Sequence, residues 1–226
     1  MNTTRFIVLA VTAGILGCSE RHSDPTTAAV PIIPAEEALA LFGTEVMVAL
    51  VNLHPDPKDK AAAEERLRTE FSRIIDKYAP SLRPEEGSKR YVSNDESFVL
   101  VIAANGTNGK KGAEASVADD QVRVVVAIGG DGSPAPQGGG AGGGSASARA
   151  PNGVAVALGG RGGDGRAGGG GGGCGATGGI GSISLGGEGG KGNRSGSNGG
   201  PAGGSGIVNA KAIIEAVEQL KEAKGG

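Results

Sequence analysis

The sequence has few of the residues from which most binding and catalytic sites are built. Only 3% of its 226 residues are aromatic and none is tryptophan, so stacking platforms for nucleobases or sugars are nearly absent. It contains two histidines and two cysteines, in no arrangement that suggests a Ser/His/Asp or Cys/His site. Its 22 basic residues balance 24 acidic ones, which argues against nucleic acid as a partner because phosphate binding needs a cationic surface.

Long hydrophobic runs are also lacking. The N-terminal apolar run, residues 6–16, is shorter than the roughly 20 residues that a membrane-spanning helix requires. It follows a single positive residue, Arg5, and has the layout of a secretory signal. We therefore predict export, with a signal peptide over residues 1–17.

The end of this run, Ile15-Leu16-Gly17-Cys18, resembles the lipobox of bacterial lipoproteins. In that family a peptidase cuts before the cysteine, which then carries the lipid. The resemblance implies a lipidated Cys18, a tether over 18–34, and contact with the membrane through the lipid. Ser19 resembles the default signal for sorting to the outer membrane. The alternative is a plain signal peptide that ends near a cysteine.

Cys174 is the only other thiol. If Cys18 is acylated, Cys174 has no intramolecular partner. Three interpretations of Cys174 are possible: a free thiol, an intermolecular disulfide bridge, or a small residue buried among glycines.

We predict a helical segment over residues 35–94. Apolar residues recur at three- and four-residue spacing from Leu39 to Leu53, between Pro34 and Pro55, which predicts a first helix. A second helix is predicted over about 57–78, with an apolar stripe opposite a charged face that includes Arg68 and that we expect to lie in solvent. The two should pack as a hairpin, followed by a polar connection over 80–94.

Glycine is the residue in excess, and 36 of the 45 glycines lie between residues 129 and 206. From residue 97 the apolar period changes to two, which predicts short strands. These strands end at Ile102, Ile128, Leu158 and Leu185, and each is followed by a glycine-bearing arm. The spacing of 26 to 30 residues indicates an internal repeat over 97–206. Two runs of small residues, Glu114–Asp119 and Ser145–Ala150, are candidate return strands.

So much glycine must be either ordered by close packing or disordered. Ordering 36 glycines costs on the order of 20–35 kcal/mol more than ordering alanines, which only dense backbone packing can offset. The triplets GGRGGDG and GGEGGKG resemble polyglycine-II packing, as in glycine-rich surface proteins of the PGRS type and some phage-tip adhesins. We favour a stacked β/polyglycine array, and a disordered glycine-rich spacer is the alternative.

The final segment, 207–226, returns to a helical period, with Ile207, Ala210, Ile214, Val217 and Leu220 on one face. We expect this helix either to dock on the helical hairpin or to cap an open edge of the array. The sequence thus predicts an α+β fold, with an N-terminal helical hairpin, a glycine-rich array and a C-terminal helix.

Three short motifs resemble sites for phosphate or calcium. Gly129-Gly130-Asp131-Gly132 resembles the glycine-rich loop of sugar, lipid and NAD kinases, but Pro134 follows where a helix should start. Gly106–Lys110 resembles the phosphate loop of Mur-ligase-type enzymes, but Lys111 replaces the hydroxyl residue. Gly159–Asp164 resembles the start of a calcium β-roll repeat, but Lys191 stands at the equivalent of Asp164 in the next repeat.

We therefore expect no catalysis and no cofactor or metal. The sequence predicts a lipid-anchored cell-envelope protein, a structural or adhesive scaffold whose array meets a protein or cell-surface partner. The candidate contacts are the charged residues that we place at the arm tips: Asp131, Arg161, Asp164, Arg166, Glu188 and Lys191. The alternative function is a phosphate- or nucleotide-binding enzyme that uses the GGDG or GTNGK loop.

Overall fold

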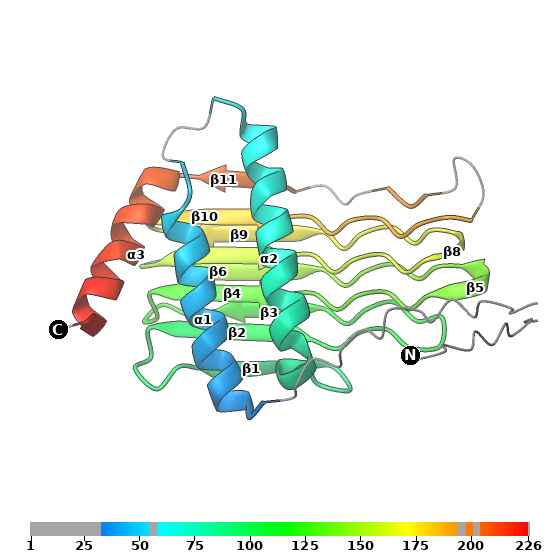
Figure 1. The fold of residues 1–226 in the computed structure, drawn as a ribbon, viewed down its shortest axis with the longest axis horizontal. Coiled ribbons are helices and arrows are strands. Elements are labelled where there is room, and N and C mark those ends of the chain that lie inside the picture. The colour runs from blue at the N-terminus through cyan, green and yellow to red at the C-terminus, as the bar shows by residue number, and fades with distance from the viewer. Residues whose placement is uncertain (1–32, 55–57, 194–197, 201–203, 226) are drawn as a thin grey trace, which may run out of the picture. The chain divides into compact units, whose positions relative to one another are not determined.

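Three helices and eleven strands form in the part of the chain that the computed structural model describes, residues 33–54, 58–193, 198–200 and 204–225. The predicted signal peptide and nearly all of the tether, including Cys18, lie outside these residues. The described residues belong to one compact unit, Pro31–Gly226. The predicted α+β class is confirmed, with two N-terminal helices, a stacked array and a C-terminal helix (Figure 1).

The two N-terminal helices form the predicted hairpin. Helix α1 is Ala35–Val51 and helix α2 is Lys60–Leu82, whose first turn is capped by the Asp59 carboxylate 3.1 Å from the amide of Ala62. Glu45 on α1 ties the pair together, because its carboxylate accepts hydrogen bonds from the side chains of Arg73, Lys77 and Tyr78 at 2.6–2.8 Å.

Helix α2 runs four residues beyond the predicted end at Tyr78 and contains Pro80. Proline in the last turn removes a single helical hydrogen bond, and continuing the helix buries Leu82, which is 1% exposed. Burial of this leucine therefore outweighs the local preference of proline for a helix end.

The larger sheet has the strand order β1-β2-β4-β7-β10-β11. Its four central strands are parallel and in register, and they are the four predicted from the alternating pattern: β2 (Phe98–Ala103), β4 (Val124–Ile128), β7 (Val154–Leu158) and β10 (Gly181–Leu185). Beneath them lies a second parallel sheet, made of β3 (Ala115–Ala118), β6 (Ala146–Ala150) and β9 (Cys174–Gly178). The first two are the predicted return strands.

Two edge strands were missed. Strand β1 (Ser88–Val92) pairs antiparallel with β2, within what the sequence indicated was a polar connection. Strand β11 (Gly206–Val208) pairs antiparallel with β10, where the sequence indicated the start of the final helix. Both lie at sheet edges: β1 is mostly polar or charged, and β11 is only three residues long, so neither shows the apolar alternation that identifies a strand.

Helix α3 (Ala210–Gly225) contacts α1 and β10, so it docks on the hairpin, while β11 covers the open edge of the larger sheet. Ile213 and Val217 are fully buried, whereas Ile214 and Leu220 are only partly buried. Ala210 and Val217 of the predicted face are thus buried, but Ile213 takes the place of Ile214 in the core, and Ile207 lies in β11 rather than in the helix.

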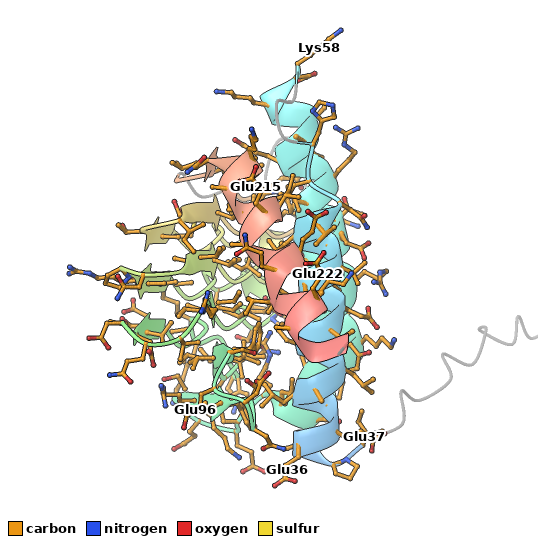
Figure 2. All side chains as sticks on the ribbon, turned by 90° about the vertical axis from the view of Figure 1, so that its left-hand side faces the viewer. Glu36, Glu37, Lys58, Glu96, Glu215 and Glu222 are labelled. Carbon is orange, nitrogen blue, oxygen red and sulfur yellow. The ribbon has the colours of Figure 1, made fainter. Side chains whose placement is uncertain are left out.

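The larger sheet is buried on both faces, which suits its near-continuous apolar strands. One face packs against the helices through large side chains such as Leu100, Val126 and Val156. The other packs against the smaller sheet through Ala127, Ala155, Ala157 and similar residues. The helices lie on one side of the sheets only, and α1 and α2 cross the strands (Figures 1 and 2). The helical segment and the array therefore share one core.

Each turn of the array leaves the larger sheet, runs out as one glycine-rich strand and returns as another to the smaller sheet. We call these the outgoing and return arms, and they extend beyond α2 (Figure 1). The second turn ends at β5 (Ala135–Gly139) and the third at β8 (Gly165–Ala167), which pair with each other. We call these two strands the arm ends.

Candidate functional site

Most interior positions of the arms have no room for a side chain. A Cβ on Gly130 would lie 1.8 Å from the carbonyl oxygen of Ala104, one on Gly160 1.9 Å from that of Gly130, and one on Gly187 1.9 Å from that of Gly160. Backbone hydrogen bonds run between outgoing and return arms, as from Gly144 to Gly130 (2.7 Å) and from Gly160 to Gly144 (2.9 Å). Close approach of bare backbone is thus what orders the array.

Side chains on the outgoing arms stand at every third residue, with glycine at most other positions. This spacing gives Asp131 and Pro134 in the second turn, Arg161 and Asp164 in the third, and Glu188 and Lys191 in the fourth. A three-residue period is that of an extended polyglycine-type strand, so one position per turn of the strand points outward. Five of the six predicted contact residues, all but Arg166 in β8, therefore lie on one face of the array.

Asp131 and Arg161 are not at the arm tips, as the sequence analysis had placed them. Both lie against α2, where Arg161 pairs with Asp76 at 3.0 Å and Asp131 lies 3.9 Å from Arg83. The Asp131 carboxylate also accepts a hydrogen bond from the amide of Arg161 at 2.8 Å. These two residues join the arms to the helical layer, and they are only partly exposed.

The other four candidates are exposed. Asp164 accepts a hydrogen bond from the amide of Lys191 at 2.7 Å, so it also links two turns of the array. Arg166 lies in β8 at an arm end, and Gly192, next to Lys191, bridges to the start of the same strand. Glu188 lies nearer to α2, beside Arg161. Burial lowers the pKa of Arg161, but the hydrogen bond and charge of Asp76, with smaller contributions from the charges of Asp131 and Glu188, raise it overall.

Sequence reasoning missed three residues that hold the arms, two in α2 and one at its C-cap. Arg83 donates to the carbonyl of Ala103 at 2.8 Å, Asp76 pairs with Arg161, and Arg68 donates to the carbonyl of Gly186. Arg68, expected in solvent, has a side chain that is 17% exposed. The spacing of 8 residues places Arg68 and Asp76 on neighbouring positions of one helix face, and this is the signal that could have identified them; Arg83 follows the helix as its C-cap.

Arg83 is the most buried of these cations, with a side chain 10% exposed. Burial lowers its pKa, an effect opposed by the nearby Asp131 carboxylate. Beside it, between α2 and the arms, is a cavity of about 40 Å³. A cavity of this size accommodates a few water molecules at most, so it cannot hold a nucleotide.

The GGDG loop has no amide left for a phosphate. The amides of Gly129, Gly130, Gly132 and Ser133 donate to backbone carbonyls at 2.8–3.2 Å, and that of Asp131 donates to the Asn105 side chain at 2.8 Å. Phosphate loops bind through free amides that point at the ligand, usually at the start of a helix. Here the following segment is an arm and then β5.

The GTNGK motif forms a tight turn in the first arm. Asn108 and Gly109 have positive φ, and the amide of Lys110 donates to the carbonyl of Thr107 at 3.1 Å. No helix follows this turn, since the chain continues as an arm into β3. Within the described residues, no group of three or more His, Cys, Asp or Glu side chains is arranged to hold a metal ion.

In comparisons with known proteins, no protein-family model, curated protein or solved structure matches the chain. Among the helices in the described part of the chain, none has the length and apolar character to cross a membrane.

Proposed function

We propose that this protein is a lipid-anchored cell-envelope protein, attached to the outer membrane through Cys18, that serves as a structural or adhesive scaffold without catalysis. The lipobox-like sequence before Cys18 supports the anchor. The partner, a protein or another cell-surface component, meets the exposed part of the array around Asp164, Arg166, Glu188 and Lys191.

The observation that carries the scaffold function is the packing of the arms. Inner glycines lie so close to neighbouring carbonyl oxygens, as at Gly160, that no other residue fits. A flexible spacer has no need of such packing, and a phosphate loop needs amides that are not already bonded. Dense packing of this kind provides stiffness, which holds the arm ends at a fixed distance from the helices.

Photo-crosslinking in intact cells tests the adhesive function. A photoreactive residue at Arg166, on the exposed arm end, should give a discrete crosslinked product with a partner. The same residue at Glu37, exposed on α1, is the matched control and should not. If both positions or neither gave a product, the arm end would not be the binding surface.

Metabolic labelling with a palmitate analogue tests the anchor separately. The wild-type chain should be labelled and recovered in the outer membrane, and Cys18→Ala should be unlabelled. An unmodified Cys18 in the wild-type protein would refute lipid anchoring but leave the scaffold function untouched.

The phosphate-binding alternative has its own test. ATP with Mg²⁺ should leave the thermal unfolding midpoint unchanged if the protein is a scaffold, because only a ligand that binds the folded state raises it. A clear rise in the unfolding midpoint would favour the enzyme instead.

The spacer alternative is tested by amide hydrogen exchange. A disordered spacer predicts random-coil exchange over the arms, whereas the packed array predicts protection.

A further inference from the structure

A groove of about 790 Å³ lies between α1, the start of the larger sheet and the end of α3. Leu39, Gly43 and Met47 of α1 form one wall, Tyr91 and Val92 of β1 form the other, and the groove reaches Phe98. Figure 2 views this side of the molecule, with Glu36 labelled at the start of α1 and Glu222 near the end of α3. Its volume and mainly apolar lining are typical of small-molecule sites.

Gly43 keeps the α1 wall of this groove open. Glycine is disfavoured inside a helix, and Gly43 lies in the middle of α1. A Cβ there would lie 3.6 Å from the Phe98 ring, an ordinary van der Waals contact, and the backbone has no positive φ. Neither crowding nor conformation therefore requires glycine at this position, and a larger side chain would fill the space beside Phe98.

Two ammonium groups stand at the rim of the groove. The Nζ of Lys89 lies 4.9 Å from the centre of the Tyr91 ring, and Lys221 comes from α3. Neither makes an ion pair with the part of the chain that the structure describes. The carboxylates at the rim are Glu36 and Asp95, and Asp95 accepts hydrogen bonds from Ser93 and Ser97 in its own turn. Lys89 and Lys221 are thus the cationic groups that an anionic ligand in this groove would contact.

The length of the groove sets the size of the ligand. Its wall on α1 extends from Ala35 to Met47, about 18 Å at 1.5 Å per residue. An extended chain advances about 1.2 Å per bond, so about fifteen bonds span this distance. We propose that the groove binds a single-chain anionic amphiphile, with its hydrocarbon chain along α1 and its head group at Lys89 and Lys221. This proposal is independent of the scaffold function.

Displacement of a dansylated fatty acid from the full chain tests the proposal. The Cys18→Ser variant is used so that no lipid can be attached at residue 18. The probe should bind, and palmitate or lysophosphatidylglycerol should displace it; the better competitor identifies the head group. Hexadecanol, with the same chain and no charge, should compete more weakly. Failure of the probe to bind, or failure of both anionic lipids to compete, would overturn the proposal.

Gly43→Leu should weaken probe binding at least tenfold, because leucine occupies the groove beside Phe98. Gly43→Ala, which fills less of the space and is the safer substitution for folding, should weaken it to a smaller extent. Val48→Leu is the matched control: it enlarges an exposed residue of α1 that does not line the groove, and binding should not change. Undiminished binding by folded Gly43→Leu would refute the groove as the site.

The head-group contact has a separate readout. The double variant Lys89→Gln and Lys221→Gln should weaken palmitate about three- to tenfold and leave hexadecanol unchanged, since only palmitate is charged. An equal effect on both ligands would contradict the assigned orientation. If the lipidated wild-type chain bound no probe while Cys18→Ser did, the groove would hold the protein's own anchor, and the proposal of an exogenous ligand would be wrong.

Discussion

Arg161, in the third outgoing arm, donates hydrogen bonds from one guanidinium nitrogen to both carboxylate oxygens of Asp76 on α2, each at 3.0 Å. The two residues are 85 positions apart in the sequence. Together with Arg68 on the same helix and Arg83 at its C-cap, Asp76 fastens turns of the array to the helical layer. Helix α2 therefore supports the arms where they leave the larger sheet.

Removing this pair should have a small effect on stability. We expect Asp76→Ala to lower the free energy of unfolding by about 0.5 kcal/mol, because partly exposed ion pairs contribute little. Urea unfolding at low salt and at about 1 M salt measures this, and the loss should shrink at high salt as screening increases. Glu37→Ala, on the exposed face of α1, is the control. A loss above about 2 kcal/mol would contradict the expectation that this partly exposed ion pair contributes little to stability.

The inner and outer glycines of the arms should respond differently to alanine. Gly160→Ala would place a Cβ 1.9 Å from the carbonyl oxygen of Gly130, so we expect a loss of about 3 kcal/mol or more, or a disrupted array. Gly170→Ala, with the nearest atom at 4.0 Å, should change stability by less than about 0.5 kcal/mol. Denaturant unfolding of the two variants measures this difference. Similar losses in both would contradict the close-packed array.

Glu45 should make part of the stability depend on acid pH. Hydrogen bonds from Lys77 and Tyr78 lower the pKa of Glu45 to about 2 in the folded protein, below the ordinary value of 4.5. A lowered pKa means that the stabilisation is complete above about pH 4.5 and is lost as the pH falls towards 2.

The matching variant is Glu45→Gln. It should be less stable than the wild type at neutral pH, and the difference should shrink between about pH 4.5 and pH 2 as the wild-type carboxylate becomes protonated. Urea unfolding of both proteins across this range provides the measurement. A difference that stayed constant with pH would show that the charge of Glu45 is not responsible.

Cys174 should react slowly in the folded protein. Burial raises the pKa of its thiol from 9.0 to about 11, and the Sγ donates to the carbonyl of Gly204 at 3.3 Å. The thiolate fraction at pH 8 should therefore be about a hundredfold lower than for a thiol of ordinary pKa. Alkylation followed by mass spectrometry should show slow modification that accelerates in denaturant. Rapid modification of the folded chain would refute this assignment.

Much of the fold could be predicted because the signals are local. The period-two runs that end at Ile128 and Leu158 became parallel neighbours in register, and the alternation of valine with alanine in β7 assigned each face to its layer. Strand β9 was missed because Cys174–Gly178 is made mostly of small residues with no alternation. Its pairing comes from the neighbouring β6, which its own sequence does not reveal.

The candidate site was less predictable. The charges in the glycine-rich arms identified Asp164, Arg166, Glu188 and Lys191 as candidates, but their pattern could not distinguish these exposed residues from Asp131 and Arg161. That distinction depends on where α2 crosses the arms, a contact between segments far apart in the sequence. The groove beside Gly43 likewise forms from three separate segments.

The sequence by itself determined the three helices, the four central strands of the larger sheet and the glycine arms, because side-chain periodicity and the lack of a Cβ act within a few residues. Only the tertiary structure decided which charges face α2, which glycines admit no Cβ, and where a groove stays open. Those properties depend on distances between backbones that meet only after folding, and no local pattern encodes such distances.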